Sequence, residues 1–145
     1  MKYIVTGGAG FIGSNIVKKL VSKGNNVTVI DNLYTGKESN LETVKDKIIF
    51  LKDSILNIDL LEKEMKNIDG VFHQAALASV QDSFSKPDEY HNVNVNGTEN
   101  ILKMAKKNNF KVVYASSSSV YGNPEKIPIK ESDSKNPINP YAETK

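Results

Sequence analysis

Short runs rich in β-branched and aromatic residues alternate along this chain with stretches of helical periodicity, and this alternation restricts the fold more than any other feature. The expected strands are KYIVTGG, NVTVID, KIIFLKD, VFH and KVVYASS, in chain order. Helices are expected over FIGSNIVKKLVSKG, around Asp59 to Lys66, and from about Pro87 to Asn108. Strands that alternate with helices form right-handed βαβ units. The sequence therefore predicts one α/β domain over residues 1–145, with a doubly wound parallel sheet.

Two polar segments interrupt this alternation. DNLYTGKESN follows the second strand, and GNPEKIPIKESDSKNPINP follows the fifth and holds four of the five prolines. Both are expected to be loops at the carboxyl edge of the sheet, where ligands bind in doubly wound folds.

Composition excludes several classes of partner. The net charge of +2 is too small to steer nucleic acid or a membrane surface, and all nineteen basic residues are lysines. The chain has no cysteine for a disulfide or a zinc thiolate, and no metal site is predicted. The first apolar run, Tyr3 to Val5, is far too short for a signal peptide or a membrane span. A cytoplasmic protein is expected, without a nucleic-acid or membrane partner.

The stretch TGGAGFIG places Gly7, Gly10 and Gly13 between the first strand and the first helix. In a dinucleotide-binding turn the first glycine permits the tight turn, the second lets the backbone approach a pyrophosphate, and the third lets helix pack on strand. Asp31 ends the second strand, where a carboxylate can accept hydrogen bonds from both hydroxyls of an adenosine ribose. A carboxylate there repels the 2′-phosphate of NADP, so NAD is the predicted cofactor. Taken singly, each feature also fits an ordinary turn.

Tyr141 and Lys145 lie four residues apart after Pro140, which suits a first helical position, so they share one helical face. An adjacent ammonium favours a phenolate, which could take a proton from a sugar hydroxyl while hydride leaves the carbon for NAD. SSSSVYG, after the fifth strand, supplies hydroxyl groups at the same sheet edge. On pattern alone, the pair is more often a solvated helix face and the serines a strand exit that caps its own backbone.

Seven motifs occur in a characteristic order: TGGAGFIG, DN at 31–32, KDS at 52–54, HQAA at 73–76, NVNGT at 94–98, SSSSVYG and YAETK. With them the chain resembles the extended short-chain dehydrogenase/reductase family, and within it the NAD-dependent nucleotide-sugar 4-epimerases. The resemblance implies a UDP-hexose substrate, a 4-keto intermediate and interconversion of UDP-glucose and UDP-galactose. It also implies a homodimer for the full-length enzyme.

The resemblance further implies particular residue roles. Cofactor contacts are expected from Gly7, Gly10, Phe11, Ile12, Gly13, Asp31, Asn32, Leu33, Tyr34, Thr35, Gly36, Asp53, Ser54, Gln74, Ala75, Ala76, Ala78, Asn94, Tyr141 and Lys145. Ser117 matches the catalytic serine or threonine, Tyr141 the base, and Lys145 the residue that binds the nicotinamide ribose; Ser117 and Tyr141 would also contact the substrate. His73 is interpreted as a strand-end packing residue and His91 as helix surface.

The identity of the sugar substrate is not decided by the resemblance. This chain has Gln74 where the best-known epimerases commonly have phenylalanine or leucine, and Ala78 where they have lysine. A UDP-glucuronate or UDP-N-acetylglucosamine epimerase or decarboxylase is one alternative, and a non-catalytic NAD-binding module is another. Members of the family continue past the lysine into a domain that grips the nucleotide sugar. The chain is therefore expected to be the amino-terminal part of a longer enzyme, without the substrate domain and inactive on its own.

Overall fold

The computed structural model describes residues 1–145 and places five parallel strands in one sheet. The strands are β1 (Lys2–Thr6), β2 (Asn26–Ile30), β3 (Ile48–Leu51), β4 (Gly70–His73) and β5 (Lys111–Tyr114). Their order across the sheet is β3-β2-β1-β4-β5, and every neighbouring pair is parallel. The direction of winding reverses between β1 and β4, which is the topological switch point of a doubly wound sheet. The predicted fold class and all five predicted strands are confirmed.

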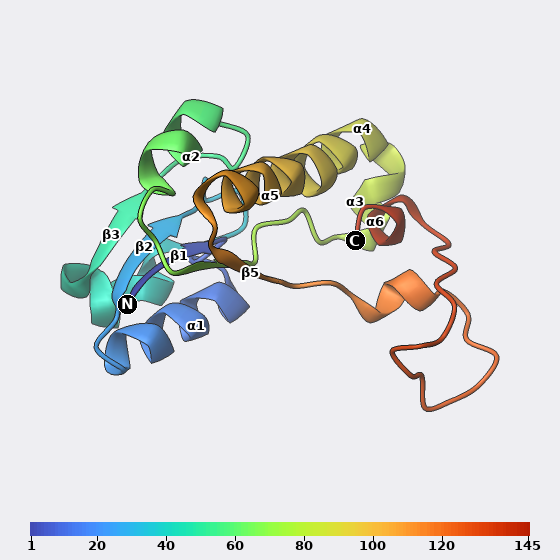
Figure 1. The fold of residues 1–145 in the computed structure, drawn as a ribbon. Helices are drawn as coiled ribbons and strands as arrows, with labels where there is room; N and C mark the ends of the chain where they lie inside the picture. Colours follow the sequence, from blue (N-terminus) through green and yellow to red (C-terminus); the bar gives the residue numbers. More distant parts are fainter.

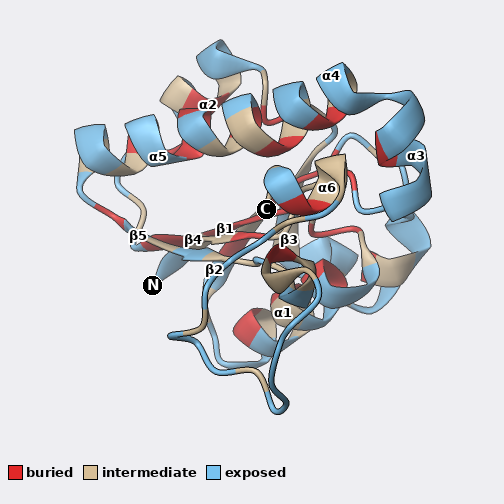
Figure 2. Ribbon diagram, turned by 90° about the vertical axis from the view of Figure 1, so that its right-hand side faces the viewer, coloured by how far each residue is buried: buried red, intermediate tan, exposed pale blue.

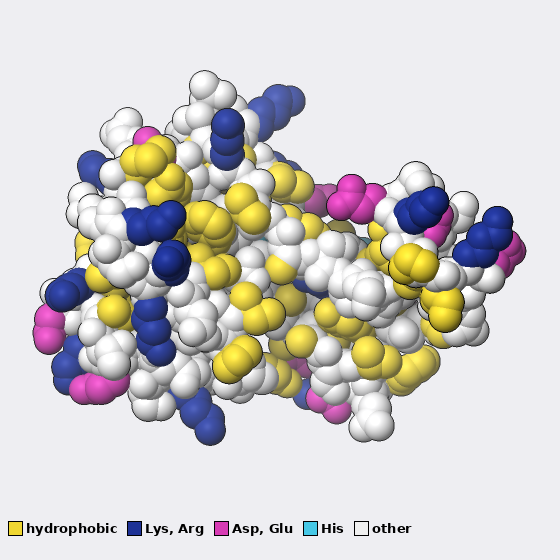
Figure 3. Space-filling view, turned by 90° about the horizontal axis from the view of Figure 1, so that it is seen from below, with side chains coloured by type: hydrophobic (Ala, Val, Ile, Leu, Met, Phe, Trp, Pro, Cys, Tyr) yellow, Lys and Arg dark blue, Asp and Glu magenta, His cyan; other side chains and the backbone are white.

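Helices cover the two faces of the sheet unequally (Figure 1). They are α1 (Phe11–Ser22), α2 (Ile58–Glu64), α3 (Val80–Ser85), α4 (Pro87–Tyr90), α5 (Gly97–Asn108) and α6 (Pro140–Glu143), with a π-helical turn over His91–Asn96 and 3-10 turns over Glu38–Lys47 and Ser118–Tyr121. In Figure 1, α2 and α5 lie above the sheet and α1 lies below it. Seen from below, hydrophobic side chains gather in the middle of the lower face, beside α1 (Figure 3). Val112 of β5 packs against the core on one face of the sheet, whereas its neighbour Val113, on the opposite face, is 53% exposed.

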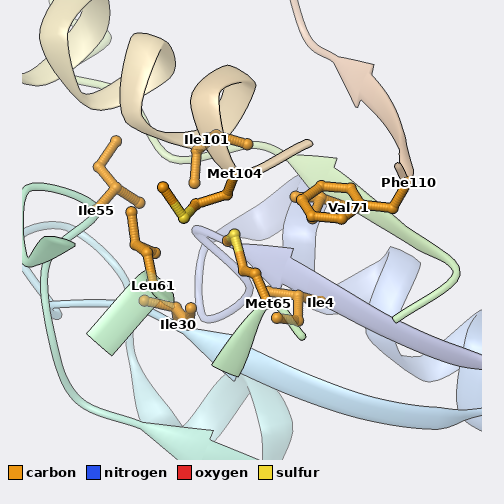
Figure 4. Packing of buried hydrophobic residues seen from close by; sticks show 9 residues of the cluster. All are labelled: Ile4, Ile30, Ile55, Leu61, Met65, Val71, Ile101, Met104 and Phe110. Atoms are coloured by element: carbon orange, nitrogen blue, oxygen red, sulfur yellow. The ribbon is translucent and has the colours of Figure 1, made fainter. Parts of the chain in front are cut away.

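Successive strand residues point to opposite faces and so enter two separate hydrophobic clusters. The upper cluster consists of Ile4, Ile30, Ile55, Leu61, Met65, Val71, Ile101, Met104 and Phe110. Figure 4 shows its side chains from the strands, α2 and α5 pointing toward one another. The lower cluster consists of Val5, Ala9, Val17, Leu20, Val27, Val29 and Leu41. Because both faces of β1 and β2 are buried, these strands are apolar at consecutive positions, as in Ile4 with Val5 and Val29 with Ile30.

The structure corrects the helix prediction in three places. The segment from Pro87 to Asn108 is helical throughout, but a π-helical turn over His91–Asn96 divides it into α4 and α5. α3 was not predicted, although Ser79 caps it by accepting a hydrogen bond from the backbone N–H of Asp82 at 3.2 Å. The 3-10 turns over Glu38–Lys47 begin inside the segment that was predicted to be a loop. Gly24 follows α1 with a φ of +75°, at the end of the segment predicted to be the first helix.

The carboxyl-terminal segment differs from the rest of the chain. Residues 122–139 contain no helix or strand, and Figure 2 shows them as a mostly exposed loop that extends below the sheet. α6 begins at Pro140, as predicted, and the Asn139 side chain caps it by accepting a hydrogen bond from the N–H of Ala142 at 2.8 Å. None of the helices is both long enough and apolar enough to cross a membrane.

Candidate functional site

A cleft lies at the carboxyl ends of the first four strands, at the position where doubly wound folds bind their ligands. It is lined by Gly7, Gly10, Ile30, Asp31, Asn32, Tyr34, Thr35, Gly36, Asp53, Ser54, Ile55, Gln74, Ala75, Ala76, Leu77, Glu89 and Val93. These residues follow β1, β2, β3 and β4 or belong to the helical segment after β4. The order of the strands therefore assembles the cleft from segments that are far apart in the sequence.

The glycine turn between β1 and α1 leaves space only where a ligand would approach. Gly7 has a φ of +66°, and a Cβ atom there would lie 2.6 Å from the backbone nitrogen of Ala75. A Cβ atom on Gly13 would lie 2.1 Å from the carbonyl oxygen of Gly7, so helix and strand pack too closely for any side chain. At Gly10, which lines the cleft, a Cβ atom would meet only the Gly7 carbonyl oxygen, at 3.3 Å. The three glycines thus have the distinct roles that a dinucleotide-binding turn requires.

The amino terminus of α1 lies beside the same cleft, because its N-cap residue lines it. Gly10 is the N-cap residue, and it supplies no side-chain cap. No acidic side chain lies in the first turn of α1, so no carboxylate within that turn offsets the positive end of the helix dipole. A phosphate fits such a helix terminus. The residues present therefore fit the pyrophosphate of a dinucleotide.

Asp31 ties the glycine turn to the loop after β2 and keeps capacity for a ligand. Its side chain is 8% exposed. Oδ2 accepts a hydrogen bond from the N–H of Ala9 at 2.9 Å, and Oδ1 accepts one from the N–H of Leu33 at 2.8 Å. Each carboxylate oxygen can accept a second hydrogen bond. A Cβ atom on Gly36 would lie 2.9 Å from Oδ1, so glycine is needed beside the carboxylate. Asp31 can therefore accept hydroxyl groups of a ribose while it holds the turn.

The cleft gathers most of the residues that were predicted to contact a cofactor. Those that line it are Gly7, Gly10, Asp31, Asn32, Tyr34, Thr35, Gly36, Asp53, Ser54, Gln74, Ala75 and Ala76. Those that do not are Phe11, Ile12, Gly13, Leu33, Ala78, Asn94, Tyr141 and Lys145. Leu77 lies within the range 74–78 that was expected along the cofactor, whereas Ile30, Ile55, Glu89 and Val93 also line the cleft and were not predicted. The unpredicted residues come mainly from core positions, whose apolar side chains carry no signal of a binding site.

Asn94 lies behind the cleft. It was expected among the cofactor contacts, but its side chain is only 2% exposed. Oδ1 accepts a hydrogen bond from the N–H of Leu77 at 2.8 Å, and Nδ2 donates to the Leu77 carbonyl oxygen at 3.0 Å. Nδ2 also lies 2.9 Å from Oγ1 of Thr144, just after α6. The amide thus fixes the backbone of a residue that lines the cleft and links it to the carboxyl-terminal turn.

The three residues predicted to be catalytic lie in the segments that follow β5, and no hydrogen bond joins them to one another. Ser117 Oγ accepts a hydrogen bond from the N–H of Ser119 at 3.2 Å and lies 2.8 Å from Ser119 Oγ, so it caps the turn that follows. Tyr141 is partly exposed in α6. α6 contacts α3, α4 and the turn over Ser118–Tyr121. The fold therefore brings α6 and the serine segment to the same edge of the sheet.

Lys145 packs against the end of β5. Its Nζ lies 4.5 Å from the ring centroid of Tyr114, within the range of a cation–π interaction. Its backbone oxygen accepts hydrogen bonds from Tyr114 Oη at 3.4 Å and Ser116 Oγ at 3.2 Å. Burial lowers the pKa of Lys145 to about 8, and burial together with Tyr141 raises the pKa of Tyr114. The ammonium is still mostly protonated at neutral pH, so a positive charge stays beside the aromatic end of β5.

The two histidines lie as expected, but the surroundings of His73 were not foreseen. His91 is exposed on the helical segment, whereas His73 is 1% exposed at the end of β4. The ring nitrogens of His73 lie 2.6 Å from Thr6 Oγ1 and 2.9 Å from Thr98 Oγ1. Burial and the charge of Lys145 lower the pKa of His73 to about 4. No pattern in the sequence indicates these partners, which are 67 and 25 residues away.

Comparison with known proteins gives consistent matches over the whole chain. The model of the NAD dependent epimerase/dehydratase family matches residues 3–145. The UDP-glucose 4-epimerase of Lactobacillus helveticus is 43% identical over 148 residues, which cover 100% of this chain and 44% of that protein. This chain therefore spans less than half the length of that relative.

Two solved structures have the same fold over nearly the whole chain. The UDP-N-acetylglucosamine 4-epimerase from Methanobrevibacter ruminantium, solved with UDP-N-acetylmuramic acid, has a TM-score of 0.94 and 43% identity. The match covers 99% of this chain and 46% of that one. The UDP-glucose 4-epimerase from Brucella ovis, solved with NAD, has a TM-score of 0.90 and 37% identity, with 99% and 44% coverage.

Proposed function

This chain belongs to the NAD-dependent epimerase/dehydratase family, and we propose that it supplies the cofactor site and catalytic groups of a nucleotide-sugar epimerase that interconverts UDP-glucose and UDP-galactose. The observation that carries the proposal is the cleft, in which the glycine turn, the amino terminus of α1 and Asp31 converge. The turn and helix terminus suit a pyrophosphate, and the carboxylate suits an unphosphorylated ribose. NAD is the dinucleotide that matches both.

Bound NAD would supply a hydride acceptor for C4 of the sugar and would return the hydride to the opposite face of the 4-keto sugar. Tyr141 is the proposed base, which takes the proton of the C4 hydroxyl and gives it back in the second half-reaction. Lys145 is proposed to favour the phenolate through its charge and to bind the nicotinamide ribose. Ser117 is proposed to hold the reacting oxygen by a hydrogen bond. These three groups come from segments that the fold places at one edge of the sheet.

A second candidate substrate is UDP-N-acetylglucosamine. The UDP-N-acetylglucosamine 4-epimerase from Methanobrevibacter ruminantium is 43% identical to this chain. The Lactobacillus helveticus UDP-glucose 4-epimerase has the same identity to this chain. The cleft of this chain is built around the cofactor, so it does not discriminate between the two sugars. A non-catalytic NAD-binding module would need only the glycine turn and Asp31, whereas this chain also has Ser117, Tyr141 and Lys145.

The proposal is tested by joining this chain to the carboxyl-terminal part of the Lactobacillus helveticus epimerase and assaying the purified chimera with NAD. We expect the chimera to convert UDP-galactose to UDP-glucose. The 145-residue chain alone should not catalyse this conversion in either direction. A folded chimera that binds NAD and turns over no nucleotide sugar would remove the enzymatic function and leave the binding module.

A further inference from the structure

His73 is a buried polar residue between the cleft and α5 that the proposed chemistry does not use. It is the last residue of β4 and does not line the cleft, yet both of its ring nitrogens have hydrogen-bond partners. The partners are the hydroxyl groups of Thr6, at the end of β1, and Thr98, in α5. The ring of Tyr114 packs beside it, with 5.7 Å between ring centroids. A histidine so enclosed has no route to a substrate, but it joins three elements of the fold.

The directions of these hydrogen bonds fix the tautomer of His73. A hydroxyl group has one proton to donate, and the Thr98 hydroxyl donates it to the backbone carbonyl oxygen of Asn94, which can only accept. Thr98 Oγ1 must therefore accept from His73, so Nε2 carries the proton. In the neutral ring Nδ1 then accepts, and its partner is the Thr6 hydroxyl. Thr6 Oγ1 in turn accepts a hydrogen bond from the N–H of Ala75 at 3.3 Å.

A single directed chain of hydrogen bonds results. It begins at the N–H of Ala75, passes through the Thr6 hydroxyl, the His73 ring and the Thr98 hydroxyl, and ends at the carbonyl of Asn94. Every proton on this chain has one acceptor. A second proton on the ring would leave two donors facing each other at Thr6, and the Thr6 hydroxyl would have to turn away from His73.

Both ends of this chain hold the backbone that forms one wall of the cleft. Residues 74–77 all line the cleft. Ala75 is bonded through Thr6, and Leu77 is bonded on both sides by the Asn94 side chain. The nitrogen of Ala75 also lies 2.6 Å from the point where a Cβ atom of Gly7 would be. A shift of this wall by a few tenths of an ångström therefore changes the space beside the glycine turn.

We propose that His73 is a positioning residue which, as the neutral Nε2–H tautomer, fixes residues 74–77 for cofactor binding. This inference rests on the proposed NAD site. His73 acts through Thr6 and Thr98 and does not contact the cofactor. Through these hydrogen bonds His73 holds the cleft wall in a fixed position relative to α5. The N–H of Ala75 at one end and the carbonyl oxygen of Asn94 at the other set the direction of the hydrogen bonds.

The first test is ¹⁵N NMR of the 145-residue chain, which reports the protonation of each ring nitrogen. The chain has only two histidines, so His91→Gln assigns the signals. We expect Nε2 of His73 to be protonated and Nδ1 to be unprotonated at neutral pH, with or without NAD. A His73 ring with its proton on Nδ1, or one that is doubly protonated at neutral pH, would overturn the directed chain.

The second test compares Thr98→Val with Thr98→Ser, at a residue that does not line the cleft. Valine keeps the shape and removes the hydroxyl, whereas serine keeps the hydroxyl. Thr98→Val removes two hydrogen bonds, one to His73 and one to the Asn94 carbonyl oxygen, and loss of each corresponds to up to about a tenfold change in an equilibrium constant. We expect Thr98→Val to weaken NAD binding by about that factor, and Thr98→Ser to bind NAD nearly as well as the wild type.

The outcomes separate the two proposals. If the wild-type chain is folded and binds no NAD, the proposed function fails, and the positioning role fails with it. If the wild type binds NAD and folded Thr98→Val binds it equally well, only the positioning role is overturned, even where the melting temperature has fallen. If both Thr98 variants lose the same affinity, the loss does not depend on the hydroxyl group, which also contradicts the positioning role.

Discussion

The cofactor cleft and the carboxyl-terminal segment are stabilised in different ways, although both lie at the same edge of the sheet. The cleft is formed by the ends of buried strands, and Asp31 is fixed by two backbone N–H groups. The segment after β5 runs through residues 122–139 without a helix or strand and ends in α6, a single turn. α6 is held by the Asn139 cap and by hydrogen bonds from Asn94, Tyr114 and Ser116. The cleft is therefore built into the buried sheet, whereas α6 is a single turn that depends on these polar contacts and on its packing against α3, α4 and the turn over Ser118–Tyr121.

The largest expected effect separates chemistry from cofactor binding. In the chimera, Tyr141→Phe should lower the epimerisation rate by about two to four orders of magnitude, because no group remains to accept the hydroxyl proton. NAD should stay bound, since phenylalanine keeps the ring and removes only the hydroxyl group. Ser117→Ala, measured alongside, should cost less. Steady-state rates and NAD titrations check both statements, and a Tyr141→Phe rate within threefold of wild type would remove Tyr141 from the mechanism.

The next effect tests how tightly the glycine turn is built. Gly13→Ala places a Cβ atom 2.1 Å from a backbone oxygen, which cannot move aside as a side chain can. We expect a loss of about 3 kcal/mol in the free energy of unfolding, at the upper end of overpacking costs. Gly10→Ala is the matched control, because its Cβ atom meets only one oxygen, at 3.3 Å.

Urea unfolding followed by circular dichroism measures both alanine variants. Gly10→Ala should keep most of the stability and lose NAD affinity, since its methyl group enters the cleft. Equal stability of the Gly13→Ala and wild-type chains would show that helix and strand are packed less closely than the structure has them.

Acid should lower the free energy of unfolding, because His73 is buried in its neutral form. Its pKa is about 4 in the folded chain against an ordinary value of 6.5, because burial and Lys145 disfavour the charged ring. The unfolded chain therefore binds a proton below pH 6.5 that the folded chain does not bind until about pH 4. Stability is lost as the pH falls through this window, by up to about 3 kcal/mol from this group.

Denaturant unfolding between pH 7 and pH 4 measures this loss. His73→Gln should flatten the pH dependence, whereas His91→Gln, which changes an exposed side chain, should leave it unchanged. A wild-type chain with the same pH dependence as His73→Gln would contradict a neutral, buried His73.

The smallest expected effect concerns the choice of cofactor. Asp31→Ala removes a ribose acceptor and the repulsion of a 2′-phosphate, so NAD binding should weaken by about tenfold or more while NADP binding changes less. Asp31→Asn is the matched variant, because it removes the charge and keeps one carbonyl oxygen for hydrogen bonding. Calorimetric titrations of both cofactors give the ratio. An unchanged ratio in both variants would show that Asp31 does not select the cofactor.

Local patterns predicted the strands, the glycine turn and the role of Asp31, because each depends on residues adjacent in the sequence, whereas most other residues of the cleft were expected only from the resemblance to a known family. Gly7, Gly13 and Asp31 act through backbone geometry that a short motif already specifies. Asn94 shows the limit of such reasoning: the motif marked it as important, but only the fold shows that it holds Leu77 and does not line the cleft. 

Contacts between distant segments were not predictable. The chain of hydrogen bonds through His73 joins residues from β1, β4 and α5, and no spacing in the sequence indicates it. The π-helical turn over His91–Asn96 was likewise not predicted, since the sequence from Pro87 to Asn108 indicates a continuous helix. By contrast, α3 had a local signal that was overlooked, namely Ser79 three residues before Asp82.

The most direct test of the central claim is calorimetric titration of NAD into the 145-residue chain at pH 7.5, with NADP titrated in parallel. The cleft is assembled entirely within residues 7–93, so we expect one NAD to bind per chain and NADP to bind more weakly. A chain that is folded by circular dichroism but binds no NAD, or that binds NADP more tightly, would contradict the claim that this sheet edge is a preformed NAD site.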